Sequence, residues 1–385
     1  MNKKPDSNAR TELINQLRLK YHKATRREKA EMINTVILSY GYNRKSVIRA
    51  LNKPAHEHSE KKRTRRKISH YDAVLPILRQ IWKASNYLCG KRLHSIIPLY
   101  ISRMSQAGEL WLSPDQMDLL LTISPATIDR VLCVDRHKVR PQGFCTTRPG
   151  SVLVHQIKVK TFSQWDDTKP GYFAMDWVAF CGESLQGEFV YVLSMTDIAT
   201  GWVALAAFMG RSEQAFVEAV LAVKGLLPFP LYGVHVDNDA TFISSLVFRF
   251  CVNNQITMTR SRPNKSNDNC FVEQKNWDVV RKNLGYQRYD TPEQLVLIRQ
   301  ILPLLMTYQN VFQPSMRLLA KHRDGAKVHK TYAKAKTPLQ QLVEHDSTPS
   351  ELAYMLQNAD TNLSPVQLRK AIDTLLEQLD RLPQK

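Results

Sequence analysis

Three acidic residues stand out because of where they fall on predicted elements of the chain. Asp176 lies inside the apolar run FAMDWVAF, which predicts a strand, and a carboxylate is costly to hold there without a partner or a task. Asp237 ends a second predicted strand, GVHVDND, and Glu273 falls in the first turn of a predicted helix. Carboxylates from such elements can converge at the edge of a sheet, where their oxygens suit Mg²⁺ or Mn²⁺. A satisfied structural aspartate is the alternative for Asp176.

The elements around these acids follow a recognisable order from about residue 150. Three β-rich runs, a helix, a fourth strand, a second helix, a short strand and a final helix follow one another. This order predicts an α/β RNase H-like core over residues 150–287, with a mixed five-stranded sheet and helices on both faces. The three acids would then come from three different elements of one domain.

The spacing of the acids resembles that of a known superfamily. Asp237 and Glu273 have 35 residues between them, His235 and Asn238 complete an H-x-D-N string around Asp237, and RSRPNKSNDNCFVEQKN leads up to Glu273. Over residues 145–340 the chain therefore resembles DDE transposases and retroviral-type integrases. The resemblance implies that Asp176, Asp237 and Glu273 hold two Mg²⁺ or Mn²⁺ ions and catalyse 3′-end cleavage and strand transfer. It also implies double-stranded DNA as partner and a dimer or larger synaptic assembly.

Two departures from the family pattern leave alternatives open. Asp239 stands where relatives usually have glycine, so either Asp237 or Asp239 is the second ligand, and the spacing favours Asp237. Relatives often carry a basic residue two turns after the glutamate, where this chain has Val280. Lys275 and Arg281 are the candidates for that contact with the terminal DNA phosphate.

Two polar residues beside Asp237 are candidates for supporting roles. His235 alternates with Val236, which predicts that it points to the same side as Asp237. It would then orient the carboxylate or contact DNA, and a packed histidine is the equal alternative. Asn238 is the second candidate for a supporting role.

Charge divides the chain unevenly. The formal net charge is +19, and residues 1–170 hold 32 Lys and Arg against 14 Asp and Glu, whereas residues 171–285 hold 9 against 11. This distribution predicts a polyanion-binding front half attached to a near-neutral catalytic part.

Helical patterns in the front half predict where DNA would bind. Residues 1–52 predict a helix-turn-helix domain whose last helix exposes Arg44, Lys45 and Arg49; a generic three-helix bundle is the alternative. A capping box of Thr25 and Glu28 opens the middle helix. Residues 53–68 predict a basic linker, and residues 69–138 a second helix-turn-helix domain, in which Ser124-Pro125 opens the last helix. The further DNA-contact candidates are Arg63, Arg65, Arg66, Thr127 and Arg130.

The remaining features bound the class of protein. Residues 288–345 predict a basic segment after the core, and residues 346–385 predict C-terminal helices within a mainly helical region. The six cysteines show no CxxC spacing, and no apolar run approaches membrane-spanning length. We therefore expect a cytoplasmic protein that does not bind membranes, and the resemblance implies a cell of bacterial type. A nuclease that cleaves without joining, and an inactive transposase-derived regulator, are the alternative functions.

Overall fold

The computed structural model describes residues 7–40, 42–52, 70–136, 158–159, 169–239, 241–261, 275–324, 327–359 and 363–383. These residues form two compact units, Met1–Ser69 and His70–Lys385. The predicted basic linker lies outside the described residues, as do Arg63, Arg65, Arg66 and Glu273.

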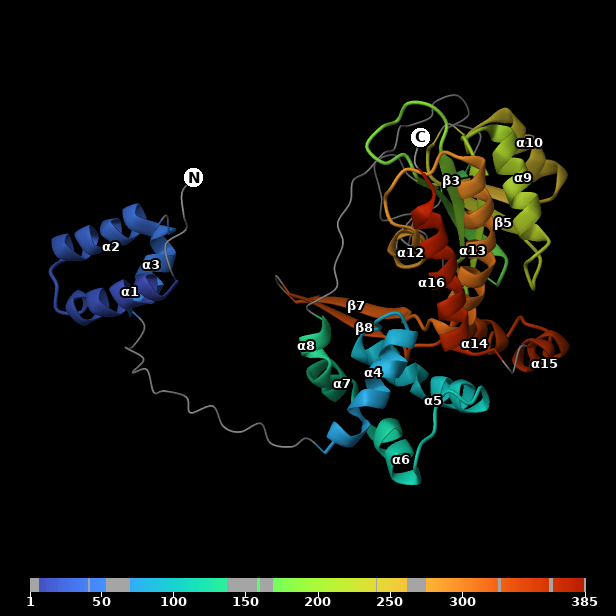
Figure 1. The fold of residues 1–385 in the computed structure, drawn as a ribbon. Helices are drawn as coiled ribbons and strands as arrows, with labels where there is room; N and C mark the ends of the chain where they lie inside the picture. Colours follow the sequence, from blue (N-terminus) through green and yellow to red (C-terminus); the bar gives the residue numbers. More distant parts are fainter. Residues whose placement is uncertain are drawn as a thin grey trace. The chain divides into compact units, whose positions relative to one another are not determined.

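The first unit is a small three-helix cluster, as its pattern predicts. Its helices are α1 (Ser7–Tyr21), α2 (Arg26–Tyr40) and α3 (Arg44–Asn52) (Figure 1). The predicted capping box is present, because Glu28 Oε2 accepts from the Thr25 backbone N–H at 2.7 Å. Asn43 Oδ1 likewise accepts from the Lys45 N–H and opens α3. Buried apolar residues hold the three helices together: Tyr21, Ile33, Val36, Val47 and Leu51.

The second unit begins with helices that pack directly on its α/β core. They are η1 (Asp72–Val74), α4 (Leu75–Ala84), α5 (Gly90–Gln106), α6 (Pro114–Thr122), α7 (Pro125–Val131) and α8 (Cys133–Arg136). The Tyr308 hydroxyl donates to the Ala84 carbonyl and the Gln313 amide donates to the Ser85 carbonyl. The predicted second helical domain thus belongs to the same compact unit as the sheet.

A mixed sheet forms the centre of this unit. Its strands are β1 (Lys158–Val159), β2 (Tyr172–Ala179), β3 (Val190–Asp197), β4 (Val203–Met209), β5 (Gly233–Val236) and β6 (Thr257–Arg260). The order is β1-β6-β5-β2-β3-β4, with β3 antiparallel to both neighbours and β2, β5 and β6 parallel. The five longer strands and the helices between them follow one another along the chain as predicted, and the mixed sheet has the arrangement of an RNase H-like core. A further strand of two residues, β1, pairs with β6 at the end of this five-stranded sheet.

Helices cover both faces of the sheet (Figure 1). On one face α9 (Glu213–Lys224) and α10 (Ser245–Asn253) pack on apolar side chains of β2 and β3, such as Met175 and Leu193. On the other face α13 (Pro292–Phe312) and α16 (Pro365–Arg381) share a core with Val178 and Val192. Successive strand residues point to opposite faces, so Asp176 points to the α13 side.

Helix α13 also covers the free edge of β4. The Asn310 side chain accepts from the Val203 N–H and donates to the Val203 carbonyl, both at 2.8 Å, and Arg299 Nε donates to the Ala207 carbonyl. These side chains satisfy groups that would otherwise invite another strand. Among the described residues α13 is the one helix long and apolar enough to cross a membrane. Here it packs against β4 and α16 as a core helix.

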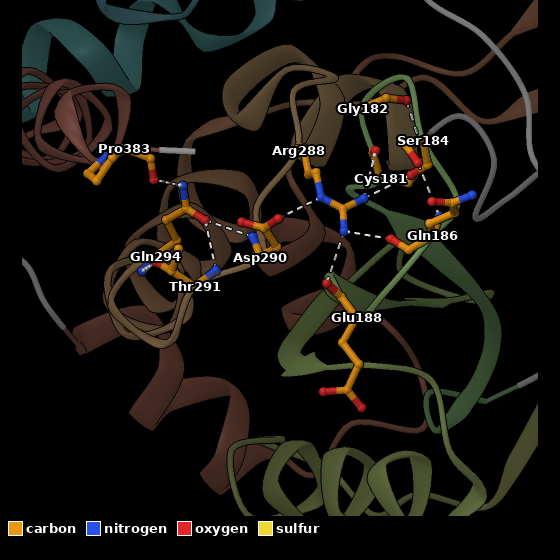
Figure 2. Close-up of polar contacts among 10 residues, drawn as sticks. All are labelled: Cys181, Gly182, Ser184, Gln186, Glu188, Arg288, Asp290, Thr291, Gln294 and Pro383. Atoms are coloured by element: carbon orange, nitrogen blue, oxygen red, sulfur yellow. Dashed lines mark hydrogen bonds and ion pairs between the residues drawn. The ribbon is translucent and has the colours of Figure 1, made fainter. Parts of the chain in front are cut away.

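Arg288 fixes the loop between β2 and β3 to the start of α13 (Figure 2). Its guanidinium donates to the carbonyls of Cys181, Ser184, Gln186 and Glu188 and pairs with Asp290 at 2.6 Å. The loop that leaves the strand of Asp176 is therefore held in one conformation.

The C-terminal region is mainly helical, as predicted, but two strands in it were not predicted. It contains a two-stranded antiparallel sheet of β7 (Leu318–Asp324) and β8 (Lys327–Tyr332), followed by α14 (Pro338–Val343), α15 (Ser350–Asn358) and α16. A mixed run of Lys, His and Ala carries no clear two-residue period, so no strand was predicted there. The last helix buries its apolar stripe, including Leu368, Ile372 and Leu379, within the protomer.

Candidate active site

Asp176 is held at a defined place on β2. Its Oδ1 accepts from the Trp177 N–H at 2.8 Å, and its Oδ2 accepts from Asn276 Nδ2 at 2.7 Å. On the opposite face of the strand, the Trp177 ring stacks on Phe242 at 4.8 Å and meets the edge of Phe208. This aromatic packing fixes the backbone of β2 and therefore the direction of the carboxylate.

Asp237 follows β5 directly and lies level with Asp176. In the parallel pair of β2 and β5, Phe173 pairs with Val234 and Ala174 with His235. The same register, carried on by two residues, sets Asp176 opposite Asp237 on strands about 4.8 Å apart. Both residues are partly exposed. The register therefore sets Asp176, within β2, beside Asp237 at the carboxyl end of β5.

Asp239 has a different environment from Asp237. It is 2% exposed, its Oδ1 accepts from the Thr241 N–H, and its Oδ2 pairs with Arg211 Nη1 at 2.7 Å. Its own N–H donates to Asp237 Oδ1 at 2.9 Å. Both carboxylate oxygens of Asp239 are thus engaged within the protein. The Asp239 N–H in addition supports the Asp237 carboxylate. This arrangement favours Asp237 over Asp239 as a ligand.

His235 and Asn238 both connect β5 to β6. His235 is buried, with Nδ1 3.0 Å from Thr259 Oγ1 and Nε2 3.0 Å from Ser261 Oγ. The Asn238 amide donates to the Ser261 carbonyl and accepts from Arg260 Nη1. These bonds are those of a packed histidine, the alternative that the sequence left open. Asn238 secures the backbone that carries Asp237.

Asn276 is a site residue that the sequence analysis missed. It begins the π-helix η4 (Asn276–Arg281), which continues into α12 (Lys282–Leu284). Its position three residues after Glu273 is the signal that could have found it, because residues three apart share a helix face. Single π-helical turns occur frequently at functional sites.

Two buried oxygen atoms beside Asp176 have no partner among the described residues. One is Asn276 Oδ1, on the side chain that donates to Asp176, and the other is Ser194 Oγ, on the β3 residue paired with Asp176. Buried polar atoms are normally satisfied, so these point to water or a ligand in this place. An oxygen-rich setting with two carboxylates fits Mg²⁺ or Mn²⁺. No group of three His, Cys, Asp or Glu side chains is found within the described ranges, which do not include Glu273.

The two cations predicted to contact the terminal phosphate both point inward. Lys275 is buried, and burial, followed by the charge of Arg92, lowers its pKa to about 8, while Asp278 acts in the opposite direction. Arg281 donates to the Ala179 carbonyl at 2.8 Å and lies against the Phe180 ring, and burial lowers its pKa. Contact of either residue with DNA stays a prediction. It would require Lys275 to leave its buried position, or Arg281 to give up its bond to the Ala179 carbonyl.

The candidates for DNA contact on the helices lie on the surface. Arg44, Lys45 and Arg49 are exposed on α3. On α7, Arg130 is exposed and Thr127 is partly exposed beside the N-cap Ser124. Their positions meet the first requirement of phosphate contact, and the contact itself stays a prediction.

The second unit is thus an RNase H-like α/β domain in which the strand register sets two carboxylates side by side on its central strands. The chain is 37% identical over 326 residues to "Uncharacterized protein y4rM" of Sinorhizobium fredii (strain NBRC 101917 / NGR234), and the match covers 84% of this chain and 92% of that protein. The chain belongs to the family of that protein.

Two further comparisons complete the picture. No family profile matches the chain. Among solved structures, "Structure of the HTLV-2 integrase catalytic core domain in complex with magnesium (dimeric form)" is similar at 17% identity and a TM-score of 0.27, over 38% of this chain and 90% of that chain.

Proposed function

We propose that the chain is a DDE-type DNA transposase or integrase, which cleaves 3′ ends of an element and joins them to target DNA. The observation that carries the proposal is the pairing of Asp176 and Asp237 at one level of adjacent parallel strands. The hydrogen bond from Asn276 to Asp176 supports it too, because Asn276 follows Glu273 by three residues in the sequence. Glu273 is the third acid of the proposal.

The proposed site would hold two Mg²⁺ or Mn²⁺ ions through Asp176, Asp237 and Glu273. Bound metal pairs of this kind activate the attacking oxygen and stabilise the leaving oxygen of a phosphodiester. The protein's own residues would position these ligands. Asn276 orients Asp176, and Asp239, which is paired with Arg211, supports Asp237 through its N–H. Carboxylates kept in fixed places present an acidic site that needs little rearrangement on binding.

One site would serve both chemical steps. Water attacks the phosphodiester at the element end, and the bond to the departing strand breaks to leave a free 3′-hydroxyl. That hydroxyl then attacks a phosphodiester of the target, and the target's own 3′-oxygen leaves. Each step is an in-line displacement at phosphorus, so each needs the same carboxylates.

Double-stranded DNA is the proposed partner, held by the basic front half through its phosphates. The exposed cations of α3 are the first candidates. Two element ends must be joined in concert, so the proposed working form is a homo-oligomer, a dimer or a larger synaptic assembly. The proposed place of action is the cytoplasm of a bacterial-type cell.

Strand transfer by the full chain tests the proposal. DNA from the flanks of the encoding gene is incubated with Mg²⁺ and a target plasmid, and cleaved ends and joined products are counted. Glu273→Gln, Asp176→Asn and Asp237→Asn should each reduce both products by orders of magnitude while end binding persists. Asp268→Asn, five residues before Glu273, is the matched control and should be mild.

The outcome separates the alternatives. Cleavage without joining would identify a nuclease, and binding without either reaction would identify a regulator. Joining that survives Glu273→Gln in Mg²⁺ would overturn the DDE assignment.

A further inference from the structure

A small cavity lies where the front helices of the second unit meet the π-helix and α13. Its volume is about 20 Å³, measured as the space open to the centre of a water-sized group. That is room for one such group, since a water needs roughly 10–15 Å³ on the same measure. The cavity is separate from the proposed active site. Its polar lining includes Arg92, Asp278, Lys282, Asn283, Gln309 and Gln313.

Positive charge is in excess around this cavity. Arg92 Nη1 lies 3.6 Å from Asp278 Oδ2, and Arg92 Nε donates to the Pro314 carbonyl. Lys282 Nζ donates to the Asn86 carbonyl at 2.5 Å. Burial lowers the pKa of Lys282 to about 8, Asp278 opposes that shift, and Arg92 adds to it. Two cations on the lining therefore share one carboxylate, and the buried Lys275 adds a third cation nearby.

An unused hydrogen-bond donor faces the same space. Gln309, on α13, is 5% exposed, and its Nε2 has no acceptor among the described residues. The neighbouring Gln313 amide, by contrast, donates to the Ser85 carbonyl. A buried amide N–H without an acceptor costs free energy. An acceptor in the cavity would remove that cost.

We infer that this cavity binds one small anion, a halide such as chloride, between Gln309, Lys282 and Arg92. Its negative charge would offset the cation excess, its size matches the space, and it would accept from the Gln309 amide. The anion would hold α12, which carries Lys282 and continues η4, against α5, which carries Arg92. It would thereby stabilise the helix that positions Asn276.

Thermal unfolding of the full chain tests the inference. The melting temperature is measured in sodium chloride, bromide, phosphate and gluconate at one ionic strength and pH, with gluconate as the bulky reference. Chloride and bromide should raise Tm above gluconate in a saturable way, by on the order of 2 °C at ten times Kd. A crystal grown in bromide should show an anomalous peak in the cavity.

The variant Gln309→Glu should become more stable, whereas a substitution that merely disrupts packing would lower the stability. The new carboxylate places the missing negative charge in the cavity itself. Its Tm in gluconate should therefore exceed that of the natural protein, and added halide should change it little. Gln309→Leu, which removes the donor, and Lys282→Met, which removes a cation, should both lose the halide response.

Matched controls lie on α9, where Gln214→Leu and Lys224→Met change exposed residues of the same types. Both should keep the full halide response. Equal Tm values in all four salts would overturn the inference and assign the cavity to water. A response to phosphate alone, or a Gln309→Glu protein that is less stable and still responds to halide, would overturn it too.

Discussion

Asn276 Nδ2 donates to Asp176 Oδ2 at 2.7 Å, although the two residues are 100 positions apart in the chain. The bond connects a central strand to the first residue of a π-helix. It leaves Asn276 Oδ1 buried without a partner among the described residues. The amide is therefore placed to orient Asp176 with one atom and to meet a water or a ligand with the other.

Removal of the Asn276 amide should weaken the site without unfolding it. Groups that orient a metal ligand commonly contribute 10–100-fold to metal affinity or activity, so we expect Asn276→Ala to lower Mg²⁺-dependent cleavage by about that factor. The Mg²⁺ concentration for half-maximal rate should rise. Asn283→Ala on α12, which loses a bond to Arg369, is the control. A variant with unchanged rate and Mg²⁺ dependence would show that the bond is only structural.

Substitutions at Asp237 and Asp239 should affect different properties, cleavage activity at Asp237 and stability at Asp239. Asp239→Asn breaks a largely buried pair with Arg211, whose side chain is 30% exposed, and should cost about 1–3 kcal/mol in the free energy of unfolding. Asp237→Asn should leave stability within about 1 kcal/mol and abolish cleavage. Urea unfolding and a cleavage assay on both proteins measure this. The reverse pattern would make Asp239 the ligand.

The exposed cations of α3 should contribute to DNA affinity through phosphates. Reversal of Arg44, Lys45 and Arg49 to Glu in the full chain should weaken binding to end DNA and reduce the slope of log K against log salt by about two to three units. Fluorescence anisotropy at several salt concentrations measures the slope.

The matched control reverses three other exposed cations of the first unit, Lys20, Arg26 and Arg27. These lie on α1 and at the start of α2. An equal loss in both triple variants would mean that net charge, and not the α3 face, determines binding.

Asp197 should make stability depend on pH. It is fully buried at the end of β3, and burial raises its pKa to about 6, although Thr200 and Gly171 donate hydrogen bonds to it. Because its folded pKa is above the ordinary value of 3.8, the folded protein keeps a proton that the unfolded chain has lost. Stability should therefore fall as pH rises from about 4 to 6, by up to about 3 kcal/mol, and then level off.

The comparison with Asp197→Asn isolates this effect from other titrating groups. The amide cannot ionise, so the stability of the natural protein relative to the variant should decline across that pH window. Urea unfolding at pH 4, 5, 6 and 7 measures the difference. A difference that stays constant with pH would show that Asp197 titrates at its ordinary value.

Local patterns predicted most of the elements correctly. The strands of Asp176 and Asp237, the capped helices opened by Thr25 and Ser124, and the order of strands and helices along the chain all follow from runs of residues that are contiguous in sequence. The hairpin of β7 and β8 was missed, because its Lys- and His-rich strands lack an alternating apolar face. The pairing of the front helices with α13 was also missed, since no local signal encodes it.

The sequence by itself determined which residues could form an acidic site, because residue type and spacing are visible in the chain. Only the tertiary structure decided how they are used. Asp239 pairs with Arg211, His235 bonds to Thr259, and Asn276 reaches Asp176. Each of these contacts joins separate elements, and its geometry depends on strand register and helix packing. Residue types alone do not contain that information, because a carboxylate takes its role from the donors that the fold brings within about 3 Å of it.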